Sequence, residues 1–263
     1  MNLPRPRRRL SQNFLVDKAV ISEIVTAIAP AIDDVVVEIG PGRGALTRPL
    51  LSRLAHLTVV EVDRDLAARL ASSLPAQRLT VVAGDALKFD FASLGTDLRV
   101  VGNLPYHIST PLLFRFAVFA SRIRDIHVML QKEVVARMVA RPASSEYGRL
   151  SVMLQYRFRM EKLIDVPAAA FRPVPKVDSA VVRLLPHGEA RPCSARDEAL
   201  LGQVVARAFA QRRKTLRNTL KGCLSAADFS ALGIAPAARA QELAVSDFVA
   251  IADYLEARRG DAR

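Results

Sequence analysis

The sequence predicts an α/β fold, with helices on both faces of a mostly parallel sheet, followed by a small domain built only from helices. Three observations predict it. Short apolar runs rich in β-branched residues alternate with helix-compatible segments up to residue 130, the linker-like segment Pro186–Ser194 interrupts this pattern, and no strand pattern follows it. Continuous apolar strands that alternate with helices are typical of a parallel sheet buried on both faces. We place the boundary after residue 187, which gives domains 1–187 and 188–263.

The expected strands are runs dominated by valine, isoleucine and leucine, because these side chains favour a pleated, buried surface. They are Val35–Ile39, Thr58–Val62, Leu79–Ala83, Leu98–Val101, Ile126–Leu130, Leu150–Phe158 and Ser179–Leu185. The helices expected in the first domain have apolar residues spaced three or four apart. They are Lys18–Ala29, Ala45–Leu54, Leu66–Ser73, Pro111–Ala120 and Glu133–Ala140. In the second domain the helices expected are Asp197–Lys221, Ala226–Leu232, Ala237–Glu242 and Ser246–Arg258.

The composition excludes several classes of protein. A chain of 263 residues with 51% hydrophobic and 24% charged residues is too apolar to be disordered. No apolar run reaches the roughly 18 residues of a membrane helix, and Met1–Phe14 lacks the apolar core of a secretory signal, although its arginines leave a mitochondrial leader open. Cys193, Cys223 and four scattered histidines argue against a disulfide scaffold or a metal cluster. We therefore expect a cytoplasmic protein with no metal and no membrane partner.

Positive charge is concentrated in two parts of the chain. The sequence has 38 Lys and Arg against 26 Asp and Glu, a formal net charge of +12. No acidic residue precedes Asp17, and none lies between Glu198 and Asp228. Within these two gaps the candidate RNA-binding residues are Arg7, Arg8, Arg9, Arg213, Lys214, Arg217 and Lys221. If the second gap is one helix, Arg213, Arg217 and Lys221 form a single basic line. Such patches favour a nucleic acid over a merely solubilising surface, without distinguishing RNA from DNA.

A glycine-rich segment follows the strand expected at Val35–Ile39. Gly40, Gly42 and Gly44 precede a helix, and glycines at such a place permit a tight turn and a close approach of the backbone to a ligand. With Ala45, the spacing G-x-G-x-x-A also fits a dinucleotide fingerprint. An NAD-dependent enzyme is therefore one alternative.

Acidic residues end the next two strands. Glu61 can accept hydrogen bonds from both ribose hydroxyls of an adenosine-containing ligand, and we prefer it to Asp63 because it lies nearer the strand end. Asp85 ends the third strand and can accept from an adenine amino group, although a lone Asp there is as often a cap or turn residue. Ligand-binding groups at three successive strand ends predict one site at that edge of the sheet.

The fourth strand ends in Asn103-Leu104-Pro105-Tyr106, which resembles the catalytic motif of S-adenosylmethionine-dependent methyltransferases acting on an adenine amino group. That nitrogen is a poor nucleophile because its lone pair is delocalised into the ring. The Asn103 side-chain oxygen and the Leu104 carbonyl can accept its hydrogens and favour a pyramidal nitrogen. Pro105 stiffens the turn, and Tyr106 can stack on the unpaired base. A plain strand-ending turn is the structural alternative, but a dehydrogenase has no use for this tetrad.

Further motifs extend the resemblance over most of the chain. They are Ser11–Leu15, Glu38–Gly44, Val60–Asp63, Gly84–Ala86, Asn103–Thr110, Gln131–Val134, Tyr147–Ser151, Phe171–Ser179 and Arg213–Asn218. Together they resemble the KsgA-type (RsmA) small-subunit ribosomal RNA adenine N6,N6-dimethyltransferases. The resemblance implies a Rossmann-like S-adenosylmethionine-dependent methyltransferase domain and a small helical RNA-binding domain. It also implies two successive methylations on each of two adjacent adenosines near the 3′ end of small-subunit (16S) rRNA, in an assembling ribosomal subunit.

The resemblance also implies site residues. The cofactor contacts would fall on Asn13, Leu15, Gly40, Glu61, Asp85 and Asn103, with Gly42 in the same glycine-rich loop. Phe171 would sandwich the target base against Tyr106, and a buried core aromatic is the alternative role for this residue. His107 departs from the family, where many members carry Asn, and is expected to be a partly exposed loop residue. We expect a monomer, with a dimer left open.

Two rival functions are compatible with much of this pattern. The Erm-type adenine dimethyltransferases act on large-subunit rRNA and confer antibiotic resistance; their motif resembles this one, usually with Ile where Leu104 stands. A non-catalytic ribosome-assembly or transcription factor that keeps the fold is the second rival. The intact tetrad Asn103–Tyr106 and the loop Gly40–Gly44 argue against lost catalysis.

Overall fold

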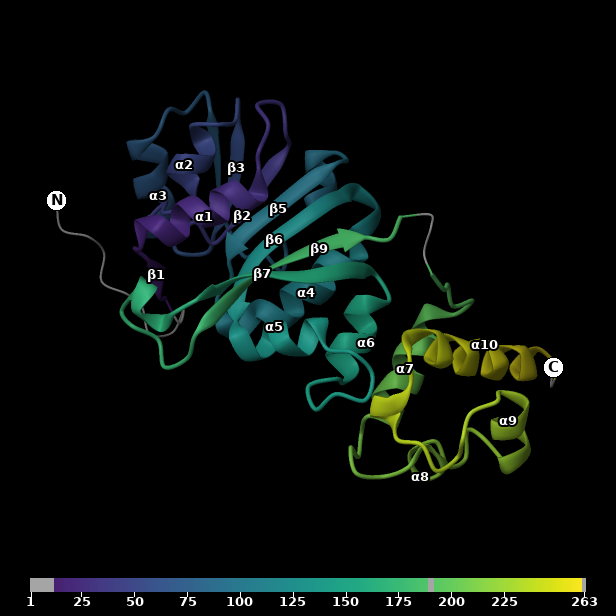
Figure 1. The fold of residues 1–263 in the computed structure, drawn as a ribbon. Helices are drawn as coiled ribbons and strands as arrows, with labels where there is room; N and C mark the ends of the chain where they lie inside the picture. The colour runs from purple at the N-terminus through teal and green to yellow at the C-terminus, as the bar shows by residue number, and fades with distance from the viewer. Residues whose placement is uncertain (1–11, 189–191, 262–263) are drawn as a thin grey trace. The chain divides into compact units, whose positions relative to one another are not determined.

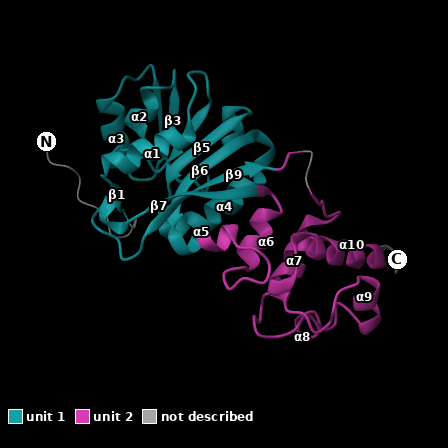
Figure 2. Cartoon of the chain, in the orientation of Figure 1, with its two compact units in different colours: residues 1–135, 159–186 teal, residues 136–158, 187–263 magenta. Residues whose placement is uncertain are grey.

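The computed structural model describes residues 12–188 and 192–261, and it divides the chain into two compact units (Figures 1 and 2). The first unit comprises residues 1–135 and 159–186, and the second comprises residues 136–158 and 187–263. The chain therefore leaves the first unit twice. Its second crossing lies beside the expected boundary at residue 187, but the segment 136–158, which we expected in the first domain, groups with the C-terminal helices.

The first unit contains a seven-stranded sheet. In spatial order its strands are β4 (Leu79–Ala83), β3 (Leu57–Glu61), β2 (Val36–Ile39), β5 (Leu98–Asn103), β6 (Ile123–Gln131), β9 (Ser179–Pro186) and β7 (Phe158–Val166). The strands from β4 to β6 pair in parallel, and β9 pairs with β6 in the antiparallel sense. Every residue of β2 and β3 is buried, so both faces of the sheet are covered at its centre. The predicted mostly parallel α/β fold is confirmed.

Helices α1 (Lys18–Ile28), α2 (Thr47–Leu51), α3 (Arg64–Ser73), α4 (Ser109–Val118) and α5 (Lys132–Val139) connect these strands. Local chemistry explains where two of them begin. The Asp17 carboxylate accepts hydrogen bonds from the backbone nitrogens of Ala19 and Val20, and Asp63 accepts one from the nitrogen of Asp65. Such caps satisfy amide groups that have no partner inside the first helical turn. The helices at Lys18–Ala29 and Leu66–Ser73 were accordingly predicted to within two residues at each end.

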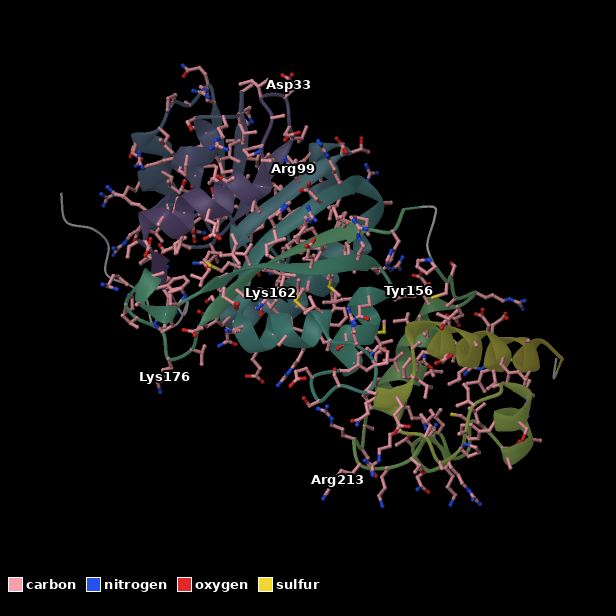
Figure 3. The ribbon with its side chains drawn as sticks, in the orientation of Figure 1. Asp33, Arg99, Tyr156, Lys162, Lys176 and Arg213 are labelled. Atoms are coloured by element: carbon pink, nitrogen blue, oxygen red, sulfur yellow. The ribbon has the colours of Figure 1, made fainter. Side chains whose placement is uncertain are left out.

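A buried ion cluster fastens the first unit at the amino ends of β5 and β6. The Arg99 guanidinium, labelled in Figure 3, contacts Asp34 at 2.6 Å and Asp125 at 2.9 Å, and it donates to the backbone oxygens of Ile28 and Ala29. These contacts lower the pKa of both carboxyl groups although burial opposes the change. The cluster ties the end of α1 to two strands, at the opposite ends of those strands from Asn103 and Gln131.

The structure differs from the prediction at one strand and adds a two-stranded ribbon. The predicted strand Leu150–Phe158 is wrong: residues Arg149–Gln155 form α6, and β7 starts only at Phe158. The Ser151 hydroxyl accepts from the nitrogen of Gly148 and donates to the carbonyl of Arg137, which fixes the first turn of a helix. A two-stranded antiparallel ribbon of β1 (Phe14–Leu15) and β8 (Phe171–Arg172) was not predicted.

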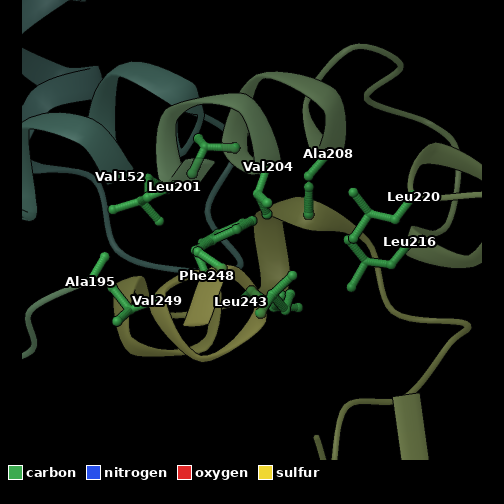
Figure 4. Packing of buried hydrophobic residues seen from close by; sticks show 14 of the residues in the cluster. Val152, Ala195, Leu201, Val204, Ala208, Leu216, Leu220, Leu243, Phe248 and Val249 are labelled. Atoms are coloured by element: carbon green, nitrogen blue, oxygen red, sulfur yellow. The ribbon is translucent and has the colours of Figure 1, made fainter. Parts of the chain in front are cut away.

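The second unit has its own hydrophobic core, formed by α6, α7 (Glu198–Ala208), α8 (Leu216–Thr219), α9 (Ala226–Ala231) and α10 (Val245–Asp261), shown in Figure 4. Leu201, Leu216 and Phe248 are among its most buried members. All regular elements wholly within the described part of this unit are helical, as the sequence predicted for the chain beyond residue 188. A fold that buries its own core in this way is expected to hold its shape without a metal or a disulfide.

The single helix predicted over Asp197–Lys221 is wrong. Arg213, Arg217 and Lys221 therefore do not form a line along one helix. The chain leaves α7 after Ala208 and becomes helical again only at Leu216. Between the two helices, hydrogen bonds to a distant segment replace those of a continuous helix: the nitrogens of Leu216 and Arg217 donate to the carbonyls of Ala238 and Pro236. The helix expected at Ala237–Glu242 shortens to a 3₁₀ turn at Ala240–Glu242.

Candidate active site

A cavity of about 220 Å³ opens in the first unit at the carboxyl ends of its parallel strands. The chain passes from β2 to β3 on one side and returns to β5 on the other, so the strand order reverses beside β2. Ligands of open α/β sheets bind at such a reversal because the loops diverge and leave a crevice. The N-terminal residues 12–15 form one wall of the cavity.

Nearly all predicted catalytic and cofactor-binding residues come together in this cavity. From the cofactor set, the lining includes Asn13, Leu15, Gly40, Gly42, Glu61, Asp85 and Asn103, and from the catalytic set it includes Leu104, Pro105 and Tyr106. His107 lines it too, and its side chain is exposed as expected. These residues come from five separate segments of the sequence; the seven-stranded sheet brings four of them to one edge, and the N-terminal segment adds the fifth.

Glycine is required at two positions around the cavity. A Cβ atom on Gly42, where φ is +56°, would lie 3.2 Å from the Phe14 ring. A Cβ on Gly102 would lie 2.4 Å from the backbone oxygen of Ile39, far inside contact distance. Gly102 thus lets the end of β5 approach β2, which places Asn103 beside Gly40. Sequence reasoning missed Gly102, because its requirement depends on a neighbouring strand.

The carboxylate of Glu61 is held at the edge of the cavity. Its Oε2 atom accepts a hydrogen bond from the nitrogen of Gly42 at 3.0 Å, and Oε1 accepts from the nitrogen of Asp63 at 2.9 Å. Burial raises the pKa of Glu61, while the backbone hydrogen bonds oppose the rise. Asp63 is not among the cavity-lining residues and caps α3, so the preference for Glu61 over Asp63 agrees with the geometry.

Glu38 is a cavity-lining carboxyl group that sequence reasoning did not single out. It lies near the carboxyl end of β2 and is only 1% exposed. Burial raises the pKa of Glu38 to about 8, and the nearby charge of Glu61 contributes to the rise. A carboxyl group with that pKa is mostly protonated at neutral pH. The signal that could have found it is a glutamate inside an otherwise apolar buried strand.

The turn after β5 holds the predicted catalytic residues. The Asn103 Nδ2 atom donates to the backbone oxygen of Asn13 at 3.3 Å, and the side-chain oxygen has no hydrogen-bond partner among the described residues. The Leu104 side chain is buried and its backbone nitrogen donates to the Met129 carbonyl. The nitrogen of Ile108 donates to the Pro105 carbonyl, which closes the turn.

Tyr106 is half-buried and fixed at two points. Its hydroxyl lies 2.9 Å from the Ser179 Oγ atom, and its backbone oxygen accepts from the Ser109 hydroxyl at 3.0 Å. Burial raises the pKa of the Tyr106 hydroxyl, and the charge of Asp178 adds to the rise.

Phe171 is not among the residues that line the cavity, and its predicted place over the target base stays a prediction. It is 1% exposed and packs in the hydrophobic core of the first unit. Its strand β8 pairs with β1, where Phe171 lies opposite Leu15, and both residues belong to that core. The alternative role, a buried core aromatic, describes this side chain in the structure.

Comparison with known proteins identifies the family to which this geometry belongs. Residues 4–257 match the family described as Ribosomal RNA adenine dimethylase. The chain belongs to that family. It is 63% identical over 253 residues to Ribosomal RNA small subunit methyltransferase A of Thiobacillus denitrificans, covering 96% of this chain and 99% of that protein. It is 61% identical over 258 residues to the protein of the same name from Aromatoleum aromaticum, covering 98% and 97%.

Two solved structures of related enzymes resemble this rRNA adenine dimethylase. A dimethyladenosine transferase from Plasmodium falciparum is 25% identical, with a TM-score of 0.75 and coverage of 90% of this chain and 95% of that one. The 23S rRNA methyltransferase ErmE is 26% identical, with a TM-score of 0.71 and coverage of 93% and 100%. The Erm-type structure thus shares this fold, whereas the two relatives above 60% identity carry the small-subunit name. A dehydrogenase is excluded by the family.

The basic residues expected to contact RNA lie in two places. Arg7, Arg8 and Arg9 lie outside the described residues. Arg213, Lys214, Arg217 and Lys221 are all exposed in the second unit of this dimethylase, and Arg213 projects into solvent in Figure 3. They occupy a loop, α8 and the turn after it. In the described parts of the chain, no helix is long and apolar enough to cross a bilayer. In those same parts no group of three or more metal-binding side chains comes together.

Proposed function

We propose that this protein transfers methyl groups from S-adenosylmethionine to the N6 atoms of two adjacent adenosines near the 3′ end of small-subunit (16S) rRNA, in an assembling ribosomal subunit. One observation carries the proposal: the turn Asn103–Tyr106 lines the same cavity, at one edge of the sheet, as the glycine loop, Glu61 and Asp85. The names of the relatives above 60% identity support the choice of the small subunit.

The residues around the cavity fit the methyl donor. Gly40 and Gly42 have no side chains, so their backbone can lie close to the ligand. A side chain at Gly42 would also meet the Phe14 ring. Glu61 offers carboxylate oxygens for the ribose hydroxyls, and Asp85 would accept from the adenine amino group through Oδ2, since Oδ1 already accepts from the nitrogen of Leu87. Asn13 and Leu15 complete the wall. When bound, the cofactor supplies an electrophilic methyl group on a positively charged sulfur.

The turn Asn103–Tyr106 prepares the target nitrogen. The side-chain oxygen of Asn103 and the carbonyl of Leu104 accept the two N6 hydrogens, which draws the nitrogen towards a pyramidal shape with an available lone pair. Pro105 has no N–H and a fixed φ, so the turn holds its acceptors with little loss of entropy at the moment of reaction. Tyr106 stacks on the base once it has left its helix. The proton is acidic after the nitrogen is alkylated, so no strong general base is required.

We propose that the first unit carries the chemistry and that the second binds RNA. Arg213, Lys214, Arg217 and Lys221 lie exposed within a segment free of acidic residues, and phosphate binding by such a segment releases counterions. The basic arm Arg7–Arg9 would add to this electrostatic attraction. We further propose that the protein acts as a monomer in the cytoplasm.

Methylation of isolated ribosomal subunits tests the proposed function. Small and large subunits that lack the modification are incubated separately with the protein and the labelled cofactor, and the modified bases are mapped. We expect label only in the small subunit, as N6,N6-dimethyladenosine at two adjacent positions. Label in the large subunit would assign the protein to the Erm type, and label in neither would leave a non-catalytic assembly factor.

A further inference from the structure

The hydroxyl group of Tyr106 needs an explanation that base stacking does not provide. Stacking uses the face of the aromatic ring, and phenylalanine would offer the same face. In the structure the hydroxyl lies 2.9 Å from Ser179 Oγ, a hydrogen-bond distance whichever atom donates. Tyr106 is thereby tied to a strand that is far away in the sequence and that has no part in the cavity lining.

Ser179 is a rigid support for that hydrogen bond. It is completely buried, and it is the first residue of β9, where it pairs with Gln131 at the end of β6. The residue before it is fixed twice: the carbonyl of Asp178 accepts from the nitrogen of Lys132 at 3.0 Å, and its carboxylate accepts from the nitrogen of Ala168 at 2.9 Å. Because Asp178 is held at both its carbonyl and its carboxylate, and Ser179 itself is buried and paired in β9, the Ser179 Oγ atom has little freedom to follow a moving ring.

A second hydrogen bond holds the other end of Tyr106. Ser109, the first residue of α4, donates its hydroxyl to the Tyr106 carbonyl at 3.0 Å and is itself buried. With the backbone fixed by Ser109 and the hydroxyl fixed by Ser179, the two side-chain torsions between them are restricted. The ring is therefore preorganised before any base arrives, which lowers the entropy lost on stacking.

We propose that Ser179 is a positioning residue for methyl transfer: its hydroxyl holds the Tyr106 ring at the tilt that the stacked target adenine requires. This inference rests on the proposed function. It matters most for the second transfer, because the monomethylated base has only one N6 hydrogen left for the two acceptors of the turn. In the second transfer, stacking on a fixed ring therefore contributes more to positioning the target base than it does in the first.

A double-mutant cycle tests the proposal, with the variants Tyr106→Phe, Ser179→Ala and the double variant. We expect each single change to lower kcat/KM for small subunits about three- to tenfold, as for the loss of one neutral hydrogen bond. The kcat/KM of the double variant should be no lower than that of the less active single variant, because both changes remove the same hydrogen bond. The monomethylated product should accumulate in all three, and the dissociation constant for the cofactor should not change.

Ser151→Ala is the matched control. Ser151 is as completely buried as Ser179 and makes comparable hydrogen bonds, but it lies in α6 of the second unit and outside the cavity lining. The Ser151→Ala variant should have a lower melting temperature than the wild type, with an unchanged ratio of mono- to dimethylated product. If Ser151→Ala and Ser179→Ala change that ratio equally, Ser179 has only a structural role.

A spectroscopic measurement detects the hydrogen bond without any catalysis. The chain has four tyrosines and no tryptophan, so the ¹³Cζ resonance of Tyr106 can be assigned as the one missing in Tyr106→Phe. We expect Ser179→Ala to shift that resonance and to leave the other three in place. An unmoved resonance, or effects on kcat/KM that multiply in the double variant, would overturn the proposal. If the wild-type protein methylates neither subunit, the proposed function itself fails.

Discussion

The side-chain nitrogen of Asn103 donates a hydrogen bond to the backbone oxygen of Asn13, 3.3 Å away. This contact engages the amide nitrogen and leaves the side-chain oxygen available as an acceptor. It also joins the N-terminal wall of the cavity to the turn that we propose holds the target amine. The contact thereby supports the proposed acceptor role of Asn103.

Gly102→Ala should damage the site from a position that touches no substrate. The added Cβ would lie 2.4 Å from the Ile39 oxygen, so β5 and β2 would have to separate beside the catalytic turn. We expect a loss of about 1–3 kcal/mol in the free energy of unfolding, typical of overpacking, and a lower rate of methyl transfer. Denaturant unfolding and the tritiated-methyl assay measure the two effects.

Gly202→Ala is the control for that substitution. Gly202 lies inside α7, and a Cβ there would meet only the end of Met153 at 3.9 Å, an ordinary contact. Replacing a helical glycine by alanine should stabilise the protein by about 0.5–1 kcal/mol. Equal losses in both variants would contradict the assigned role of Gly102.

Glu38→Gln should change how stability depends on pH. The pKa of Glu38 is raised to about 8 from its ordinary value of 4.5, so between these values the folded protein holds a proton that the unfolded chain releases. The free energy of unfolding of the wild type should then fall as the pH rises through this window, by at most about 1.4 kcal/mol per pH unit from this group. Glutamine stays neutral and removes this contribution.

Urea unfolding at pH 5, 6, 7 and 8 measures the difference between the two proteins. The glutamine variant should gain stability relative to the wild type with each step upward in pH. A constant difference would mean that Glu38 titrates near its ordinary pKa, as an exposed carboxyl group would.

Neutralising Arg213, Arg217 and Lys221 together should weaken binding to rRNA and flatten its dependence on salt. Removing one phosphate contact lowers the slope of log K against log salt by roughly 0.7 to 0.9, so removing all three predicts a change of about 2 to 3. Binding is measured by titration at several salt concentrations. Neutralising Arg53, Lys88 and Arg122, three exposed cations of the first unit, removes the same charge and should change the slope less. An identical effect of both triple variants would mean that only net charge matters.

The sequence predicted the parts of the site that depend on local chemistry. Gly40, Glu61 and Asp85 follow or end apolar strands, and parallel strands place such residues at one edge whatever the rest of the fold does. The requirement for Gly102 and the anchoring of Tyr106 by Ser179 were not predictable, because each depends on a strand that is distant in the sequence.

Two errors in the predicted elements have physical causes of the same kind. Leu150, Val152 and Leu154 alternate as in a strand, yet the hydrogen bonds of Ser151 start a helix there. The basic residues from Arg213 to Lys221 have helical spacing, yet hydrogen bonds to Pro236 and Ala238 interrupt the helix.

Single-turnover methyl transfer by Asn103→Ala tests the central claim most directly, with cofactor binding measured on the same preparation. The account predicts that transfer of the tritiated methyl group to small subunits is abolished, because the amine loses an acceptor, while the cofactor still binds measurably through Glu61, Asp85 and the glycine loop. Full transfer by this variant would contradict the account, since the turn after β5 would then not be preparing the nitrogen that is methylated.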